Sequence, residues 1–208
     1  MKIDLTKSSH VFFFVVFLPA LSFAVGQTFE KLFPNWPFWV EGLSPLGAYA
    51  LFYAFFDKTA WHWPVFRWAG VVTAPDLRGR WVGEQLSSFK RANGKPTESH
   101  VVMEVEQTFS SVTTHTYYHR WSNTHTASEF MDIEGQQYLV VIFESEPGVR
   151  HNGTDGANKG VVRLCYRSDE KVIAGTYYNT SGNFGEMKLK RTSRKLFQQF
   201  DKPKQASS

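Results

Sequence analysis

Hydrophobic residues fall into two different patterns along the chain. In the first third they form long uncharged runs, over residues 11–26 and again over residues 46–56. From residue 76 onward they recur in short segments that alternate with polar residues and are separated by turn-forming sequences. Uncharged runs are typical of helices in a membrane, and alternation over short segments is typical of β-strands. The pattern therefore predicts a helical region followed by a β-rich domain.

The first 72 residues are predicted to form two transmembrane helices. The run over residues 11–26 is short for one span, which needs about 20 residues. Basic residues precede it and Ser22-Phe23-Ala24 resembles a cleavage site, so a secretory signal peptide is a second interpretation. The second apolar run, with tryptophans near the ends of the segments, favours a helical hairpin that anchors the chain. A third interpretation is an apolar helical subdomain packed on the β-rich domain.

Two charges follow directly on the second apolar run. Placing Asp57 and Lys58 at bilayer depth costs about 2.5 to 3.5 kcal/mol each. We therefore expect them at an interface, in the interior of the hairpin or against a partner chain. The residues predicted to belong to the membrane region are Val11, Phe14, Phe17, Leu46, Phe52, Phe55, Asp57 and Lys58.

The distribution of charge predicts the orientation of the hairpin. Basic residues gather at both of its ends, whereas the link between the two apolar runs holds one lysine and two glutamates. An excess of Lys and Arg marks the cytoplasmic side of a membrane segment. We expect a multi-pass protein whose β-rich domain faces the cytoplasm. The basic residues at the two ends are Lys2, Lys7, Arg67, Arg78 and Arg80.

The β-rich part of the sequence predicts a closed barrel. Eight short strands follow one another at even spacing, joined by turn sequences such as RANGKPT and NTSGNFG. An eight-stranded antiparallel barrel has an interior that side chains fill or that holds one small ligand. We expect a lipocalin-like minimal β-barrel that follows the helical hairpin along the chain. The expected strands cover residues 79–89, 100–109, 112–121, 124–132, 137–145, 160–168, 171–178 and 185–192. The expected domains are 1–72 for the two helices, 73–75 for a linker, 76–193 for the barrel and 194–208 for a basic C-terminal tail.

Polar and aromatic residues occupy both faces of several predicted strands. In VTTHTYYHR, residues 112–120, neither alternating face is apolar, which argues against a site for a fatty acid. Tyrosine rings stack on bases, arginine fits a phosphate, and Thr and Asn bind base edges, so the set suits a small nucleotide. The same residue types are common on solvent-facing sheets, which is the alternative. The candidate ligand-binding residues are Thr116, Tyr118, Arg120, Tyr166, Arg167, Thr176, Tyr177, Tyr178 and Asn179.

Composition argues against several classes of function. The net charge of +4 is scattered, so we expect no DNA or RNA partner. Cys165 is the only cysteine, which excludes an internal disulfide and a multi-cysteine metal site. His115 and His119 lack carboxylates at a metal-ligand spacing and no catalytic motif is present, so we expect no metal, cofactor or enzymatic activity. The basic run over residues 188–204 is either a solvated tail or a contact for a membrane surface.

Two further predictions concern structure rather than chemistry. Glu104 and Glu106 alternate with apolar neighbours, which indicates an outward face of the barrel. Trp81 and Arg191 are expected to stack at a closed end of the barrel, in a structural role.

The order of the parts resembles a known family. Two apolar N-terminal segments precede DLRGRWVGEQLSS at the first predicted strand, and the last strands read VIAGTYYNTSGNFGEMKLKRT. This arrangement is similar to the two-transmembrane, β-strand-rich effectors of CBASS, the cyclic-oligonucleotide-based anti-phage signalling system of bacteria. The resemblance covers nearly the whole chain.

The resemblance implies a function. In such effectors a minimal barrel senses a cyclic dinucleotide made by a partner nucleotidyltransferase, binding drives homo-oligomerisation, and the membrane segments disrupt the lipid bilayer of the inner membrane in abortive infection. In that setting Asp57 and Lys58 suit a pore-forming or assembly role. The alternative is a membrane-tethered, lipocalin-like protein that binds a small ligand and has no lethal output.

Overall fold

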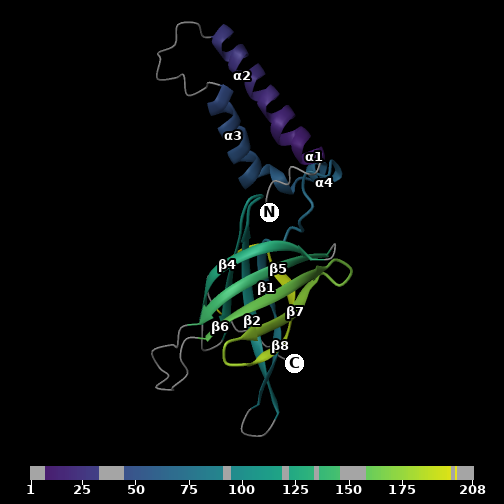
Figure 1. Ribbon diagram of the computed structural model, residues 1–208, viewed down its shortest axis with the longest axis vertical. Helices are drawn as coiled ribbons and strands as arrows, with labels where there is room; N and C mark the ends of the chain where they lie inside the picture. The colour runs from purple at the N-terminus through teal and green to yellow at the C-terminus, as the bar shows by residue number, and fades with distance from the viewer. Residues whose placement is uncertain are drawn as a thin grey trace, which may run out of the picture. The chain divides into compact units, whose positions relative to one another are not determined.

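The chain divides into a helical unit and a β unit (Figure 1). The computed structural model describes residues 8–32, 45–90, 95–118, 122–133, 136–145, 158–197 and 200. The helical unit is Met1–Ala74 together with Thr108–Ser110, and the β unit is Pro75–Gln107 together with Ser111–Ser208. The turn Thr108–Ser110 thus joins two strands of the β unit but clusters with the helices.

The helical unit is a hairpin of two helices followed by short helical turns. One continuous helix, Ser8–Phe29, has a mean hydropathy of 2.0 and is long and apolar enough to cross a membrane. Among the described residues no second helix meets that test, because α3 has 14 residues and is about 21 Å long. The helical segments are α1 (Ser8–Val11), the π-helix η1 (Phe12–Phe17), α2 (Leu18–Leu32), α3 (Pro45–Lys58), the 3₁₀-helix η3 (Ala60–His62) and α4 (Pro64–Trp68).

Aromatic side chains form the core of the helical unit. Phe14 and Phe56 are buried, with ring centroids 5.6 Å apart, and they pack with Trp61 and Phe109. The opposite face of the first helix carries apolar side chains that are exposed, which is the arrangement of a helix facing lipid. Those exposed residues are Phe12, Val15, Val16, Phe17, Leu21, Phe23 and Val25.

The residues predicted for the membrane region divide between the core and the surface of this unit. Phe14 lies in the core, and Phe52 packs against the core. Phe17, Leu46, Phe55 and Lys58 are exposed, whereas Val11 and Asp57 are half-buried.

The β unit is a closed barrel of eight antiparallel strands in chain order, as predicted. Each strand pairs with the next, and β8 pairs with β1 to close the sheet, with Trp81 opposite Arg191. The strands are β1 (Gly79–Lys90), β2 (Pro96–Gln107), β3 (Val112–Tyr118), β4 (Ser122–Ile133), β5 (Gln136–Ser145), β6 (Asn158–Arg167), β7 (Val172–Asn179) and β8 (Phe184–Ser193).

Alternation along the strands separates the barrel interior from its outer face. Inward residues such as Met103, Leu139, Leu164 and Leu189 are almost completely buried in one core. Strands also approach one another closely: a Cβ on Gly83 would lie 2.0 Å from the Lys188 carbonyl oxygen, so only glycine fits there. Side chains therefore fill much of the interior.

One end of the barrel is closed by a tryptophan and an arginine, as predicted. The Arg191 guanidinium carbon lies 4.6 Å from the centroid of the Trp81 ring, and the guanidinium also donates to the Asp76 carbonyl oxygen. The Trp81 indole donates to the Leu77 carbonyl oxygen at 2.8 Å. The indole N–H of the buried Trp81 and one terminal nitrogen of the half-buried Arg191 are thereby paired with backbone carbonyls, which indicates a structural role for this end.

The C-terminal segment covers part of the outer face. Glu104 lies on that face, as predicted, yet its side chain is only 1% exposed and pairs with Arg80 at 2.8 Å. The same carboxylate oxygen accepts a hydrogen bond from the Phe197 backbone N–H at 2.8 Å, and Arg80 lies over the Phe197 ring. The expected tail therefore begins as a segment that packs on the barrel.

Candidate functional site

A hydrogen bond inside the barrel joins two polar side chains from strands that are not neighbours in the sheet. The Tyr118 hydroxyl on β3 donates to the Gln85 side-chain oxygen on β1 at 2.6 Å. Burial raises the pKa of Tyr118, and the neighbouring Tyr177 raises it further. Tyr118 therefore stays neutral and keeps its proton for hydrogen bonding throughout the physiological pH range.

Threonine hydroxyls extend the polar part of the interior. Thr114 and Thr116 on β3 are almost completely buried, and the Thr114 hydroxyl lies 3.2 Å from that of Ser128. Thr97 on β2 shares the face of Val101, and its buried hydroxyl has no hydrogen-bond partner among the residues that the structure describes. Buried polar atoms are nearly always paired, so this hydroxyl is available to a water or to a bound molecule.

Four of the predicted ligand-binding residues point into the barrel. Thr116, Tyr118 and Tyr177 lie on inward positions of β3 and β7. Tyr166 also points inward but packs edge-on against Trp81, at 6.2 Å between ring centroids. Trp81 and Gln85 are four residues apart on β1. The Trp81–Tyr166 pair and the Tyr118–Gln85 pair are therefore separated by about 13 Å along the strand.

The other predicted residues do not join this interior set. Tyr178 is 62% exposed, and Arg167 and Thr176 lie on the outer face. The Asn179 side-chain oxygen accepts from the Asn183 backbone N–H at 2.9 Å, so Asn179 shapes the turn between β7 and β8. Arg120 lies outside the described residues.

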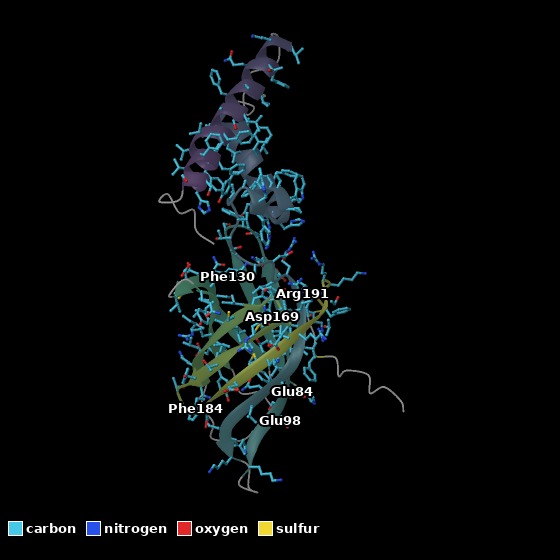
Figure 2. All side chains as sticks on the ribbon, turned by 90° about the vertical axis from the view of Figure 1, so that its right-hand side faces the viewer. Glu84, Glu98, Phe130, Asp169, Phe184 and Arg191 are labelled. Carbon is cyan, nitrogen blue, oxygen red and sulfur yellow. The ribbon has the colours of Figure 1, made fainter. Side chains whose placement is uncertain are left out.

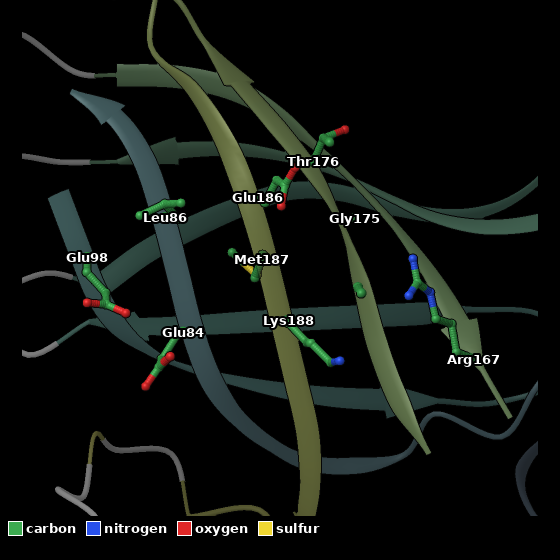
Figure 3. A pocket seen from close by; sticks show the side chains of 10 residues that line it. Glu84, Leu86, Glu98, Arg167, Gly175, Thr176, Glu186, Met187 and Lys188 are labelled. Atoms are coloured by element: carbon green, nitrogen blue, oxygen red, sulfur yellow. The ribbon is translucent and has the colours of Figure 1, made fainter. Parts of the chain in front are cut away.

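Arg167 and Thr176 contribute instead to a groove on the outer face of about 400 Å³ (Figure 3). Figure 3 shows Glu84 and Glu98 on one side of this groove and Arg167 on the other. Lys188 and Arg167 both pair with Glu170, at 2.6 Å and 3.5 Å, which offsets part of their positive charge. The remaining carboxylates repel an anion, so this groove is a poor site for a phosphate.

A comparison with known families identifies the barrel. Residues 72–191 match the family described as Cap15, cyclic dinucleotide receptor domain, which covers more than half of the chain. The chain belongs to the Cap15 family. Its barrel is a cyclic dinucleotide receptor domain of the CBASS type, which confirms the resemblance, and the family is one of receptors rather than enzymes. No curated protein sequence gives a significant match.

Sequence reasoning missed three polar residues of the interior. Gln85 and Thr97 lie on strands that the apolar alternation of Trp81 and Val101 already oriented. Thr114 shares its face with Thr116 and Tyr118, so the same period of two includes it. Every second residue, counted in both directions from the apolar core residues of a strand, points inward. This rule identifies all three residues.

Proposed function

We propose that the barrel binds a cyclic dinucleotide at the end of its interior marked by Tyr118 and Gln85. We propose further that binding drives self-association, after which the helices disrupt the bacterial inner membrane. The observation that carries the first step is the family match, which covers the barrel whose interior holds the Tyr118 cluster.

The chemistry of the cluster suits a nucleobase. Stacking of a base on an aromatic ring contributes about 1 to 3 kcal/mol, and Tyr118 and Tyr177 supply two such rings. The Gln85 amide and the Thr97 hydroxyl supply a donor and acceptors for base edges. The Tyr118–Gln85 bond is satisfied within the protein, so an incoming base joins or replaces it.

We assign phosphate recognition to an arginine. Arg191 points inward but stacks on Trp81 at the closed end, and Arg163 lies over the Tyr138 ring on the outer face. Arg120, two positions after Tyr118 in the sequence, is the cation that we propose for a phosphate of the cyclic dinucleotide.

A row of exposed apolar residues supports the proposed self-association. Four large side chains face solvent in direct register across β5 to β8, with exposed fractions between 41% and 62%. Contiguous apolar patches on soluble domains mark interaction surfaces. We propose this apolar row as the barrel–barrel contact. Its residues are Ile142, Val161, Tyr178 and Phe184.

The apolar row is linked to the interior by neighbouring residues on one strand. Tyr177 faces the interior and Tyr178 faces solvent, so a displacement of β7 by a bound base also moves the apolar row. The cyclic dinucleotide shifts the equilibrium only if it binds the associated state more tightly than the monomer. Figure 2 shows Phe184, one member of the apolar row, and Arg191 near opposite ends of β8.

The helical unit supplies the proposed membrane activity. The apolar helix Ser8–Phe29 is consistent with membrane association. We propose that it and α3 enter the inner membrane with the barrel in the cytoplasm, and that concentrating several copies disturbs lipid packing.

A binding screen joined to a leakage assay tests the proposal. The full-length protein in dye-loaded vesicles is exposed separately to cyclic di-AMP, cyclic di-GMP, cyclic GMP-AMP and cyclic di-UMP. At a hundredfold excess over its dissociation constant, a bound compound stabilises the fold by about 2.7 kcal/mol. We expect stabilisation and dye release by the same compound. Stabilisation without release would instead identify a tethered binding protein, and no stabilisation by any cyclic dinucleotide would refute the proposed site.

A further inference from the structure

The turn between β2 and β3 forms part of the core of the helical unit. Phe109, in the middle of this turn, is 1% exposed. Its ring centroid lies 5.3 Å from that of Phe14 on the first helix and 4.9 Å from that of Phe56 on α3. The helical hairpin is therefore packed around a residue that the barrel sequence supplies.

Asp57 fixes the backbone of the same turn. Its side-chain oxygen accepts a hydrogen bond from the Ser110 backbone N–H at 2.7 Å, and its carbonyl oxygen accepts one from the Phe109 backbone N–H at 2.9 Å. Asp57 is the last residue but one of α3, where the helix dipole disfavours a negative charge. The bond to Ser110 gives a physical reason for an acid at this unfavourable position.

The strands on either side of this turn carry the proposed binding site. β2 holds Thr97 and ends at Gln107, and β3 begins at Val112 and ends at Tyr118. β3 has only seven residues and spans about 20 Å from Val112 to Tyr118, so the turn and Tyr118 lie on one short stretch of the chain. A change in β3 at Tyr118 therefore reaches Phe109 through a short and continuous stretch of backbone.

We propose that Asp57 and Phe109 couple the occupancy of the barrel to the packing of the two helices. This inference rests on the proposed function and adds the route by which a cyclic dinucleotide alters the membrane segments. The route requires that the turn move with the helices. The hydrogen bonds of Asp57 and the buried ring of Phe109 provide that attachment.

The test compares full-length variants at the two partners of one hydrogen bond. Asp57→Ala removes the acceptor, whereas Ser110→Ala keeps the backbone N–H donor and serves as the matched control. Asp57→Asn keeps a side-chain oxygen acceptor and removes only the charge. Each protein is placed in dye-loaded vesicles with whichever of the four screened cyclic dinucleotides stabilises the wild type, and both its dissociation constant and the rate of dye release are measured.

We expect Asp57→Ala to bind within about twofold of the wild type but to release dye at least about tenfold more slowly. Ser110→Ala should match the wild type, and Asp57→Asn should recover most of the release. Phe109→Ala should behave as Asp57→Ala does, and an unchanged dissociation constant shows that its barrel is folded. Wild-type rates in both Asp57→Ala and Phe109→Ala would overturn the coupling alone. A wild type that binds without releasing dye would overturn the proposed function and the coupling with it.

Discussion

The Tyr118 hydroxyl and the Gln85 side-chain oxygen are joined by a 2.6 Å hydrogen bond that spans the width of β2 inside the barrel. β1 and β3 are not neighbours in the sheet, so the bond ties together two strands that share no backbone ladder. It is also the place where the otherwise apolar core becomes polar. Stability and recognition are therefore both expected to depend on this pair.

Replacing Tyr118 by Phe should weaken both properties. The change leaves the half-buried Gln85 oxygen without its donor, at a cost of about 0.5 to 1.5 kcal/mol in the free energy of unfolding. We also expect about tenfold weaker binding of a cyclic dinucleotide. Tyr138→Phe is the matched control, because the Tyr138 hydroxyl bonds to Gln136 on the exposed face. Equal effects of the two changes in urea unfolding would contradict an interior role for Tyr118.

Tyr177 and Tyr178 offer a test in which neighbouring residues have opposite roles. Tyr177 is buried in the barrel and Tyr178 belongs to the apolar row. Tyr177→Ser should abolish measurable binding of cyclic dinucleotides in calorimetry. Tyr178→Ser should leave binding intact and reduce ligand-dependent self-association in analytical ultracentrifugation. Met131→Ser, at another exposed apolar position on β4, should change neither property. If Tyr178→Ser abolished binding instead, the site would lie on the outer face.

The sequence was sufficient to predict the barrel because its strands alternate regularly. Val101, Met103 and Val105 mark one face of β2, and the turns between strands are rich in Gly and Asn. The sequence assigned the candidate binding residues to the inner or the outer face less reliably, because polar residues occur on both faces of β6 and β7. Adjacent residues such as Tyr177 and Tyr178 are assigned to different faces only when the pairing register is known.

The hydrogen-bond partner of Asp57 could not be predicted from sequence patterns, for a different reason. Its partner Ser110 is 53 residues away, in a turn that carries no sequence signal for packing with a helix. The charge was expected at an interface, inside the hairpin or against a partner chain, and Asp57 bonds to the Thr108–Ser110 turn. Contacts of this kind depend on tertiary structure, and local periodicity does not encode them.

Glu104 should be among the most sensitive positions of the barrel. Glu104→Ala leaves the buried Arg80 guanidinium without its carboxylate and removes the acceptor for Phe197. Removing one partner of a buried ion pair costs about 3 to 5 kcal/mol. Lys159→Ala breaks an exposed pair with Glu144 and should cost about 0 to 1 kcal/mol. Unfolding in guanidinium chloride measures the loss in the free energy of unfolding for both variants. Similar small losses in the two variants would show that the C-terminal segment does not shield Glu104 from solvent.

Asp76 should make the stability of the barrel depend on acidity. Burial alone raises the pKa of its carboxyl, but the hydrogen bonds and charge of Arg78, with Arg194 beyond, outweigh burial and lower it below the usual value. The carboxylate therefore contributes stability that is fully present above about pH 4, the value for a free aspartate, and is lost as the pH falls through the lower folded value. Melting temperatures of wild type and Asp76→Asn should converge in acid and separate above pH 4. A constant difference between them down to pH 2 would contradict this role.

The last prediction concerns the path of the chain across the membrane. The helix Ser8–Phe29 has spanning length, whereas α3 is about 21 Å long against a hydrocarbon thickness of about 30 Å. A second crossing therefore requires residues beyond α3 or local thinning of the bilayer. The basic residues at both ends of the hairpin favour two crossings, which return the chain to the cytoplasm before the barrel begins.

Reporter fusions decide between one crossing and two. A fusion after Val72 should give a fluorescent cytoplasmic protein, and a fusion within the link at residues 33–44 should give active periplasmic phosphatase. Periplasmic phosphatase activity after Val72 would mean a single crossing. The barrel would then lie in the periplasm, away from cyclic dinucleotides made in the cytoplasm. The intact mass of the protein purified from membranes provides the control for processing. Loss of residues 1–24 would establish a cleaved signal peptide in place of the anchor, because Ala24 ends the small-residue sequence that such a cleavage requires.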